Sequence, residues 1–233
     1  MIHNDADPDV YGQALYDYFA HGSASSLTLY TTYGKREIMP VDWFFREEED
    51  YPTLEKKALE AVSGKVLDIG AGAGSHAVFL AEREYEVHTL DASALCVRIM
   101  RERGLPTVFE QSVWAPLTQR YDTLLLMMNG IGLVGKLEGL RKFLKYAREI
   151  LLPGGRIIFD SSDLSYLYQK KKSSLYPYLG EIGYMYEYAG RKGKPFSWLF
   201  IDPETMRRYA AASGWKMNVI FEDEHDQYLA ILS

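Results

Sequence analysis

The stretch VLDIGAGAGSHAVFLAE, residues 66–82, predicts a buried strand that passes through a tight loop into a helix. The apolar run carries Asp68 near its end, and Gly70, Gly72 and Gly74 alternate before the helical pattern begins. Glycine has no Cβ, so such a loop can turn sharply and let a ligand lie against the backbone. Amide groups at the start of the helix point into the same space. The stretch therefore indicates a ligand site.

The spacing of the glycines bears on the kind of ligand. The dinucleotide fingerprint G-x-G-x-x-G would place its third glycine at position 75, where this chain has Ser75. Asp68 stands two residues before the first glycine. A carboxylate repels a pyrophosphate and attracts an ammonium or a sulfonium. The loop thus favours a cationic nucleoside, and a nicotinamide-dependent oxidoreductase stays as an alternative.

A second acidic residue, Asp91, follows the predicted strand at residues 86–90. At the end of the second strand, a carboxylate can accept hydrogen bonds from both hydroxyls of a ribose. The simpler interpretation of Asp91 is a helix cap. Ser93 is itself a candidate cap for the helix that carries Leu95, Ile99 and Met100. The position of Asp91 is therefore consistent with either role.

Strands and helices alternate along the rest of the chain. The expected strands are residues 65–69, 86–90, 106–109, 122–128, 156–159, 216–221 and 227–232. An amphipathic stripe over residues 140–151 predicts one helix, and Asp202 with Pro203 marks the start of another. This order predicts an α/β fold with a doubly wound, mostly parallel, seven-stranded Rossmann-like sheet whose last strand is antiparallel.

Aromatic residues gather outside this predicted core. Of 18 tyrosines, 13 fall in residues 1–51 and 166–188. The alternation over residues 184–188 and 196–200 predicts a β-hairpin with one aromatic face, which is either packed core or a wall over an acceptor site. Residues 1–50, irregular or helical in pattern, form an expected N-terminal cap, and residues 163–200 an insertion in the domain of residues 51–233. We expect the cap and the hairpin to enclose a small acceptor.

Composition narrows the class of partner. The net charge is −6, and the basic clusters are confined to Lys170–Lys172 and Arg191–Lys194, so nucleic acid is disfavoured. The chain has no apolar run of eighteen residues, and its polar start, MIHNDADPDV, is unlike a signal peptide. Cys96 is the single cysteine, which favours a reducing, cytoplasmic compartment and a place in the core. A small organic molecule is the expected partner.

Four features together resemble the class I S-adenosylmethionine-dependent methyltransferases: the DIGAGAG loop, the acidic end of the second strand, YDTLLLMMN at 121–129 and LLPGGRIIF at 151–159. The resemblance covers residues 50–160. It implies S-adenosyl-L-methionine as cofactor and methyl transfer, by in-line displacement, to an oxygen or nitrogen of a small acceptor. A non-catalytic S-adenosylmethionine-binding protein is a further alternative.

The resemblance also implies roles for individual residues. Asp68 and the loop from Gly70 through Ala71 to Gly72 would surround the methionine moiety, and Asp91 would bind the ribose.

Three further regions complete the implied cofactor site. Ala92 would lie near the adenine, and one of Glu110, Gln111 and Ser112 would reach the adenine amino group. Met128 and Asn129, after the fourth strand, would lie close to the sulfonium.

Several other residues are candidates with two interpretations each. Arg46 is either a partner of the cofactor carboxylate or a surface partner of Glu47–Glu49. Tyr33 is a candidate to point at the methyl group, and His21 is a candidate base or a structural residue. His76 either packs in the interior or faces solvent.

Metal chemistry is weakly supported. Asn129 and Asp160 end neighbouring strands and supply two oxygen ligands without a third, so no metal site is assigned.

Overall fold

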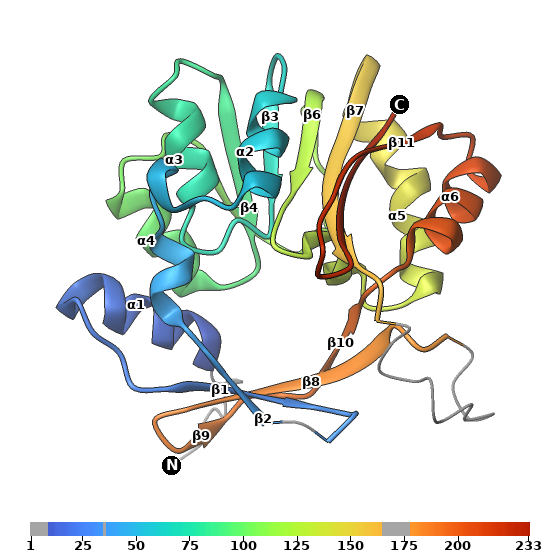
Figure 1. Ribbon diagram of the computed structural model, residues 1–233. Coiled ribbons are helices and arrows are strands. Elements are labelled where there is room, and N and C mark those ends of the chain that lie inside the picture. The colour runs from blue at the N-terminus through green and yellow to red at the C-terminus, as the bar shows by residue number, and fades with distance from the viewer. Residues whose placement is uncertain (1–8, 35, 165–177) are drawn as a thin grey trace.

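The computed structural model describes residues 9–34, 36–164 and 178–233. The chain forms a seven-stranded sheet and a five-stranded sheet. Helices flank the large sheet, and the small sheet lies beyond one end of its strands (Figure 1).

The large sheet has the predicted topology. Its strands are, in spatial order, β11 (Met217–Glu222), β12 (Gln227–Leu232), β7 (Leu151–Ser162), β6 (Tyr121–Leu126), β3 (Val66–Ile69), β4 (Val87–Asp91) and β5 (Val108–Glu110). The pairs from β7 to β5 are parallel, whereas β12 is antiparallel to both β7 and β11. The sheet is thus the expected Rossmann-like one, closed by an antiparallel pair.

Two hydrophobic clusters hold helices to the two faces of this sheet. The first contains α5 (Leu137–Ile150) and α6 (Pro203–Ala212), and the second contains α2 (Thr53–Glu60), α3 (Ser75–Ala81) and α4 (Ala94–Glu102). Leu124 and Leu126 of β6 belong to the first cluster and Leu125 to the second, because successive side chains of a strand point to opposite faces. The apolar run of β6 is therefore buried on both sides, as predicted.

Local capping explains where two helices begin. The Ser93 side chain accepts a hydrogen bond from the Cys96 amide at 3.0 Å, and Asp202 accepts one from the Thr205 amide at 2.8 Å. Both satisfy amides that lack a partner within their helix. Cys96 is fully buried, as expected of a core residue.

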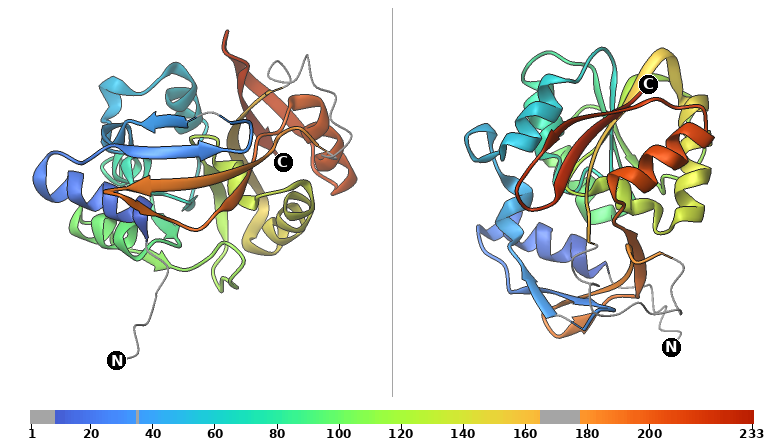
Figure 2. Two further views of the ribbon diagram at one scale, coloured as in Figure 1. Left: turned by 90° about the horizontal axis from the view of Figure 1, so that it is seen from below. Right: turned by 45° about the vertical axis from the view of Figure 1, so that its right-hand side comes forward.

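The small sheet joins two distant parts of the chain. Its strands are β10 (Phe196–Leu199), β8 (Glu181–Tyr188), β1 (Leu27–Thr31) and β2 (Arg36–Met39) in spatial order, with β9 (Arg191–Lys192) paired to β8. Phe196 lies opposite Tyr184 in an antiparallel register, which confirms the predicted hairpin. Figure 2, at left, shows β1, β2 and β8 side by side.

The expectation that residues 1–50 contain no strands was wrong. β1 pairs with β8, more than a hundred residues later in the chain, so its hydrogen bonds depend on a partner that local sequence patterns do not reveal. β2 is an edge strand with mostly exposed side chains, and it carries no apolar alternation. The same segment also contains α1 (Val10–His21), η1 (Val41–Phe45) and η2 (Glu48–Asp50), and η3 (Gly130–Val134) follows β6.

Among the described residues, no helix is long and apolar enough to cross a membrane. Lys170–Lys172, one of the two basic clusters of the sequence, lies outside the described residues.

Candidate functional site

A cavity of 1110 Å³ lies between the carboxyl ends of the large sheet and the small sheet. One wall consists of residues that follow β3, β4, β5 and β6, and the other consists of residues from α1, η1, β1, β2, β8 and β10. Pockets for one drug-sized ligand measure about 300–1,000 Å³. This cavity therefore has room for two molecules side by side.

Asp68 presents a carboxylate to this cavity without a partner for one of its oxygens. The residue is 2% exposed, and its Oδ2 atom is buried with no hydrogen bond. Burial raises the pKa of Asp68 to about 6, opposed by the nearby His76 and assisted by Asp91. A buried anion without a partner is costly for folding, which indicates that a cationic ligand group completes the site.

The glycine loop leaves the space next to Asp68 open. Gly70 and Gly72 have φ values of 72° and 57°, in the left-handed region that favours glycine. A Cβ on Gly72 would lie 3.1 Å from the Tyr11 hydroxyl, and one on Gly70 would lie 3.5 Å from a Leu133 methyl carbon. The loop therefore forms a backbone cradle in which an added side chain would narrow the cavity.

Asp91 is tied to the same loop and is also a cavity residue. Its carboxylate accepts hydrogen bonds from the Gly72 amide at 2.9 Å and the Ser93 amide at 2.8 Å. Burial raises the pKa of Asp91 to about 6, although these backbone bonds oppose the shift. Ser93 in turn donates to Asp9 at 2.6 Å, which caps α1. This chain of contacts connects the start of α1 to the carboxyl end of β4.

The loop after β5 provides one of the three residues considered for the adenine. Gln111 and Ser112 line the cavity, whereas Glu110 is exposed and is not among the lining residues. The Nε2 atom of Gln111 is buried without a partner. A primary amide carries both a donor and an acceptor, as the edge of an adenine requires. Gln111 is thus the best placed of the three, next to Ala92, which also lines the cavity.

Met128 and Asn129 form a strained turn at the end of β6. Their φ values are 63° and 55°, so the strand stops at Leu126 and does not run to residue 128 as predicted. The Asn129 amide donates to Asp160 at 2.8 Å, and its carbonyl accepts from the Trp198 indole at 3.1 Å. These contacts hold both residues in the cavity wall, and such strain is typical of ligand sites.

The wall formed by the small sheet is aromatic. Tyr184, Tyr186, Phe196, Trp198 and Phe200 all line the cavity. The rings of Tyr186 and Phe196 lie 5.4 Å apart, and Phe196 meets Trp198 edge-to-face at 6.2 Å. The aromatic hairpin therefore lines the cavity, and its role as a wall over an acceptor site stays a prediction.

Tyr11 of α1 extends this aromatic wall. Its ring stacks on Tyr186 at 5.4 Å and meets Phe44 edge-to-face at the same distance. We call Tyr11, Phe44, Tyr184, Tyr186, Phe196, Trp198 and Phe200 the aromatic roof.

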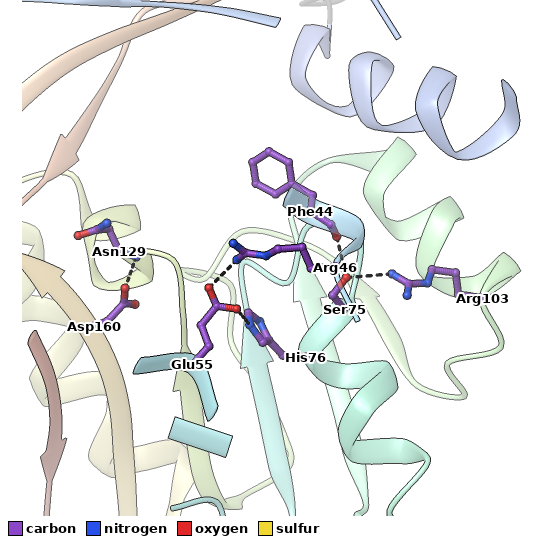
Figure 3. A network of polar contacts seen from close by, with 8 residues as sticks. All are labelled: Phe44, Arg46, Glu55, Ser75, His76, Arg103, Asn129 and Asp160. Atoms are coloured by element: carbon purple, nitrogen blue, oxygen red, sulfur yellow. Dashed lines mark hydrogen bonds and ion pairs between the residues drawn. The ribbon is translucent and has the colours of Figure 1, made fainter. Parts of the chain in front are cut away.

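The Glu55 carboxylate pairs with the side chains of both Arg46 and His76 (Figure 3). Its Oε1 atom accepts from Arg46 at 2.5 Å and its Oε2 atom pairs with His76 Nε2 at 2.8 Å. Arg46 therefore does not pair with Glu47–Glu49 on the surface, because the chain after η1 turns its guanidinium inward toward α2. His76 is buried, which corrects the solvent-facing alternative.

The same cluster sets the charge of His76. Burial lowers the pKa of His76, but the hydrogen bond and the charge of Glu55 outweigh that effect, with smaller contributions from Asp68 and Asp160. The pKa of His76 is therefore raised above its ordinary value.

Three expected contributors are not among the residues that line the cavity: Arg46, which lines a small adjoining pocket, His21 and Tyr33. His21 is exposed in the last turn of α1, whereas Tyr11, which lines the cavity, lies in the first turn. Tyr33 lies in the turn between β1 and β2, where its hydroxyl donates to Glu37 at 3.0 Å.

Asn129 and Asp160 do lie together, but in a different arrangement from a pair of metal ligands. The Asn129 side-chain oxygen accepts from Ser162 at 2.8 Å, and one Asp160 oxygen accepts from the Asn129 amide. Over residues 9–34, 36–164 and 178–233, no three candidate ligand residues form a group suited to a metal.

Known proteins share this arrangement. The family model described as a methyltransferase domain matches residues 66–155. A crystal structure of a SAM-dependent methyltransferase from Bacteroides fragilis, in complex with S-adenosyl-L-homocysteine, is 36% identical, with a TM-score of 0.90 over 97% of this chain and 94% of that one. The chain belongs to the S-adenosylmethionine-dependent methyltransferases. Its cofactor is S-adenosyl-L-methionine, and this assignment excludes the nicotinamide-dependent alternative.

More distant methyltransferase structures share the fold. The DhpI–SAM–HEP complex is 19% identical, with a TM-score of 0.62 over 77% of this chain and 84% of that chain. The CcbJ methyltransferase from Streptomyces caelestis is 16% identical, with a TM-score of 0.62 over 96% of this chain and 97% of that chain. No curated protein matches this sequence significantly.

Proposed function

We propose that this methyltransferase transfers the methyl group to the nitrogen of a small, largely apolar amine bound beneath the aromatic roof. The observation that carries the proposal is the roof itself, which lines the same cavity as the glycine loop. When bound, S-adenosyl-L-methionine would supply the methyl group: the nitrogen lone pair attacks the methyl carbon in line with the carbon–sulfur bond, and the sulfur leaves as S-adenosylhomocysteine. The protein's own part is to hold the two molecules close together and correctly oriented. This alone lowers the activation free energy by about 7–11 kcal/mol in favourable cases.

The residues present fit the cofactor in three places. Asp68 has a buried, unpartnered oxygen for the ammonium group, and the backbone from Gly70 through Ala71 to Gly72 provides the cradle for the methionine moiety. Asp91 lines the same cavity, and we assign it to the ribose.

The remaining assignments follow the cavity wall. Gln111 serves the adenine edge with Ala92 beside it, and Ser112 borders the same pocket. Met128 and Asn129 lie where the sulfonium is expected, and Arg46 is proposed as the partner of the cofactor carboxylate.

The preference for nitrogen over oxygen follows from proton chemistry. Desolvation raises the pKa values of Tyr11 and Tyr186 above the ordinary value of a tyrosine. Both phenols therefore stay neutral and do not act as bases. The Asp9 carboxylate is engaged by Ser93 and by the Gly12 amide. An alcohol must lose its proton during transfer and so benefits from a base. An amine in its free-base form already has a lone pair and attacks before any proton is removed from its nitrogen.

The roof also suits the charge that develops on an amine. Nitrogen becomes cationic as it accepts the methyl group, and aromatic faces stabilise a nearby cation by about 0.5–2 kcal/mol. Tyr186 and Phe196 present such faces on adjacent strands.

Three further residues support an acceptor that is largely apolar. Ile38, Trp43 and Trp114 line the cavity although they are 65%, 53% and 47% exposed.

Transfer of label from methyl-labelled S-adenosylmethionine tests the proposal. The acceptors are a panel of arylalkyl amines and the alcohols of identical skeleton, at a pH where part of each amine is uncharged. We expect incorporation with members of the amine series only. Incorporation into the alcohols and not the amines would contradict the nitrogen assignment.

A further inference from the structure

Glu55 is a buried carboxylate that the proposed methyl transfer does not use directly. It lies on α2, is 6% exposed, and has each of its two oxygens on a different cationic side chain. Figure 3 shows Arg46, which follows η1, and His76 of α3 converging on Glu55. A buried carboxylate that bridges two basic side chains next to a cavity is a candidate for a role in ligand binding.

Arg46 retains unused hydrogen-bonding capacity beside the cavity. A guanidinium has five N–H donors, and Glu55 takes one of them through the Nη2 atom of Arg46. The Nε atom of Arg46 is buried without a partner. Arg46 and Glu55 do not line the main cavity but a small pocket that adjoins it, and the two spaces share Trp43, Phe44, Ala71, His76 and Met128.

We propose that Glu55 is a positioning residue that holds Arg46 and His76 as a paired cationic seat for the carboxylate of the cofactor's methionine end. Asp68, on the neighbouring β3, would take the ammonium group of the same amino acid. The inference rests on the proposed cofactor arrangement and extends it to two residues, Glu55 and His76, outside the glycine loop.

Charge balance supports this division of roles. Arg46, Glu55 and protonated His76 together carry one excess positive charge, and Asp68 adds one negative charge. The carboxylate of an amino acid can therefore pair with the group formed by Arg46, Glu55 and His76, while its ammonium group pairs with Asp68. Without Glu55, the two cations would repel each other and lose their fixed orientation.

Three ligands separate the carboxylate from everything else in the cofactor. S-adenosylmethionine has the whole amino acid, its decarboxylated form keeps the ammonium and sulfonium, and 5′-methylthioadenosine lacks both the amino-acid end and the sulfonium charge. Calorimetry would give the affinity of each for wild type, Glu55→Gln and His76→Gln. His76→Gln removes the charge and keeps a donor for Glu55.

The expected result is selective. Glu55→Gln weakens S-adenosylmethionine binding by about tenfold to a hundredfold, the range for losing charge-assisted hydrogen bonds, and leaves the other two ligands within about twofold. His76→Gln shows the same pattern with a smaller loss. The matched control is Glu48→Gln, which removes an exposed ion pair with Arg83 and should change none of the three affinities.

Several outcomes would overturn the inference. Equal weakening of all three ligands in Glu55→Gln would mean that Glu55 only supports the fold. Equal affinity of wild type for S-adenosylmethionine and its decarboxylated form would mean that no carboxylate seat exists, while the ammonium site at Asp68 would stand. Failure of the methyl-transfer assay would instead count against the proposed function.

A measurement on wild type alone avoids any folding defect of the variants. The groups that face His76 are Glu55 from α2, Asp68 from β3 and Asp160 from β7, with the ring of Tyr51 5.3 Å away. As pH rises through the raised pKa of His76, the preference for S-adenosylmethionine over its decarboxylated form should fall severalfold. A preference that stays constant from pH 6 to pH 9 would contradict a cationic role for His76.

Discussion

The Asp91 carboxylate accepts a hydrogen bond from the Gly72 amide at 2.9 Å, so the end of β4 is joined to the glycine loop after β3. The same carboxylate accepts from Ser93, which contacts Asp9 of the N-terminal segment. Asp91 and Ser93 together thus fix the loop, the start of α4 and the cap of α1 relative to one another.

Asp91→Asn should weaken every ligand that carries the ribose. S-adenosylhomocysteine and 5′-methylthioadenosine should both lose about tenfold to a hundredfold in affinity, because a charged acceptor is lost in a buried site. Calorimetry provides the measurement. Asp122→Asn is the control, since Asp122 also accepts from a backbone amide, that of Lys65 at 2.8 Å, but at the opposite end of the sheet. Equal losses in both variants would contradict the ribose assignment.

Asp68→Asn should stabilise the protein in the absence of cofactor. Burial raises the pKa of Asp68 to about 6, so between about pH 4 and 6 the folded state holds a proton that the unfolded state releases. The free energy of unfolding therefore falls as pH rises through this window. Removing the charge should recover about 3 kcal/mol at pH 8, or about 6–12 °C in melting temperature.

The same sign applies to two other buried carboxyl groups. Burial raises the pKa of Asp91 to about 6 and that of Asp160 to about 7. Thermal denaturation at pH 5 and pH 8 should show the gain from Asp68→Asn at pH 8 and a smaller gain at pH 5. A variant less stable than wild type at pH 8 would contradict the idea that the carboxylate is kept for a ligand.

Gly72→Ala should reduce cofactor affinity by more than backbone strain explains. Its φ is 57°, and the new methyl group would lie 3.1 Å from the Tyr11 hydroxyl inside the cavity. Gly104→Ala is the matched control, because Gly104 has a φ of 86° and no atom within 4 Å of the added carbon. Both variants should lose about 1 kcal/mol of stability. Only Gly72→Ala should weaken S-adenosylhomocysteine binding, and unchanged binding would place the cofactor elsewhere.

The aromatic roof should act through its ring faces. Tyr186→Phe keeps the ring and removes the hydroxyl, so kcat/KM for an amine acceptor should stay within about twofold. Tyr186→Leu removes the ring and should lower it by about 3- to 30-fold, the range of a cation–π contact. The affinity for S-adenosylhomocysteine should be unchanged in both. A loss in Tyr186→Phe equal to that in Tyr186→Leu would assign the role to the hydroxyl.

Local sequence patterns predicted the large sheet well because each of its signals is short-range. The run at residues 122–128, the caps at Ser93 and Asp202 and the glycine loop all act within a few residues, and the structure has each of them. The aromatic alternation likewise identified the hairpin of β8 and β10.

The missed features depend on long-range contacts. β1 is a strand because β8 pairs with it, and Arg46 turns inward because Glu55 lies on α2. One signal for Glu55 was present: it shares a face of α2 with the apolar Ala58 and Leu59, where a charge is unusual. The left-handed turn had a partial signal in the pair Asn129-Gly130, because asparagine adopts this conformation more readily than other non-glycine residues, whereas Met128 gave none.

The central claim is that the Asp68 carboxylate holds the ammonium group of the methyl donor. Calorimetric titration of wild type and Asp68→Asn with S-adenosylhomocysteine and with 5′-methylthioadenosine tests it most directly, because both ligands have a neutral sulfur and only the first has an ammonium group. We expect a loss of about tenfold or more for S-adenosylhomocysteine in Asp68→Asn and no change for 5′-methylthioadenosine. Equal affinities of the two proteins for S-adenosylhomocysteine would contradict the claim.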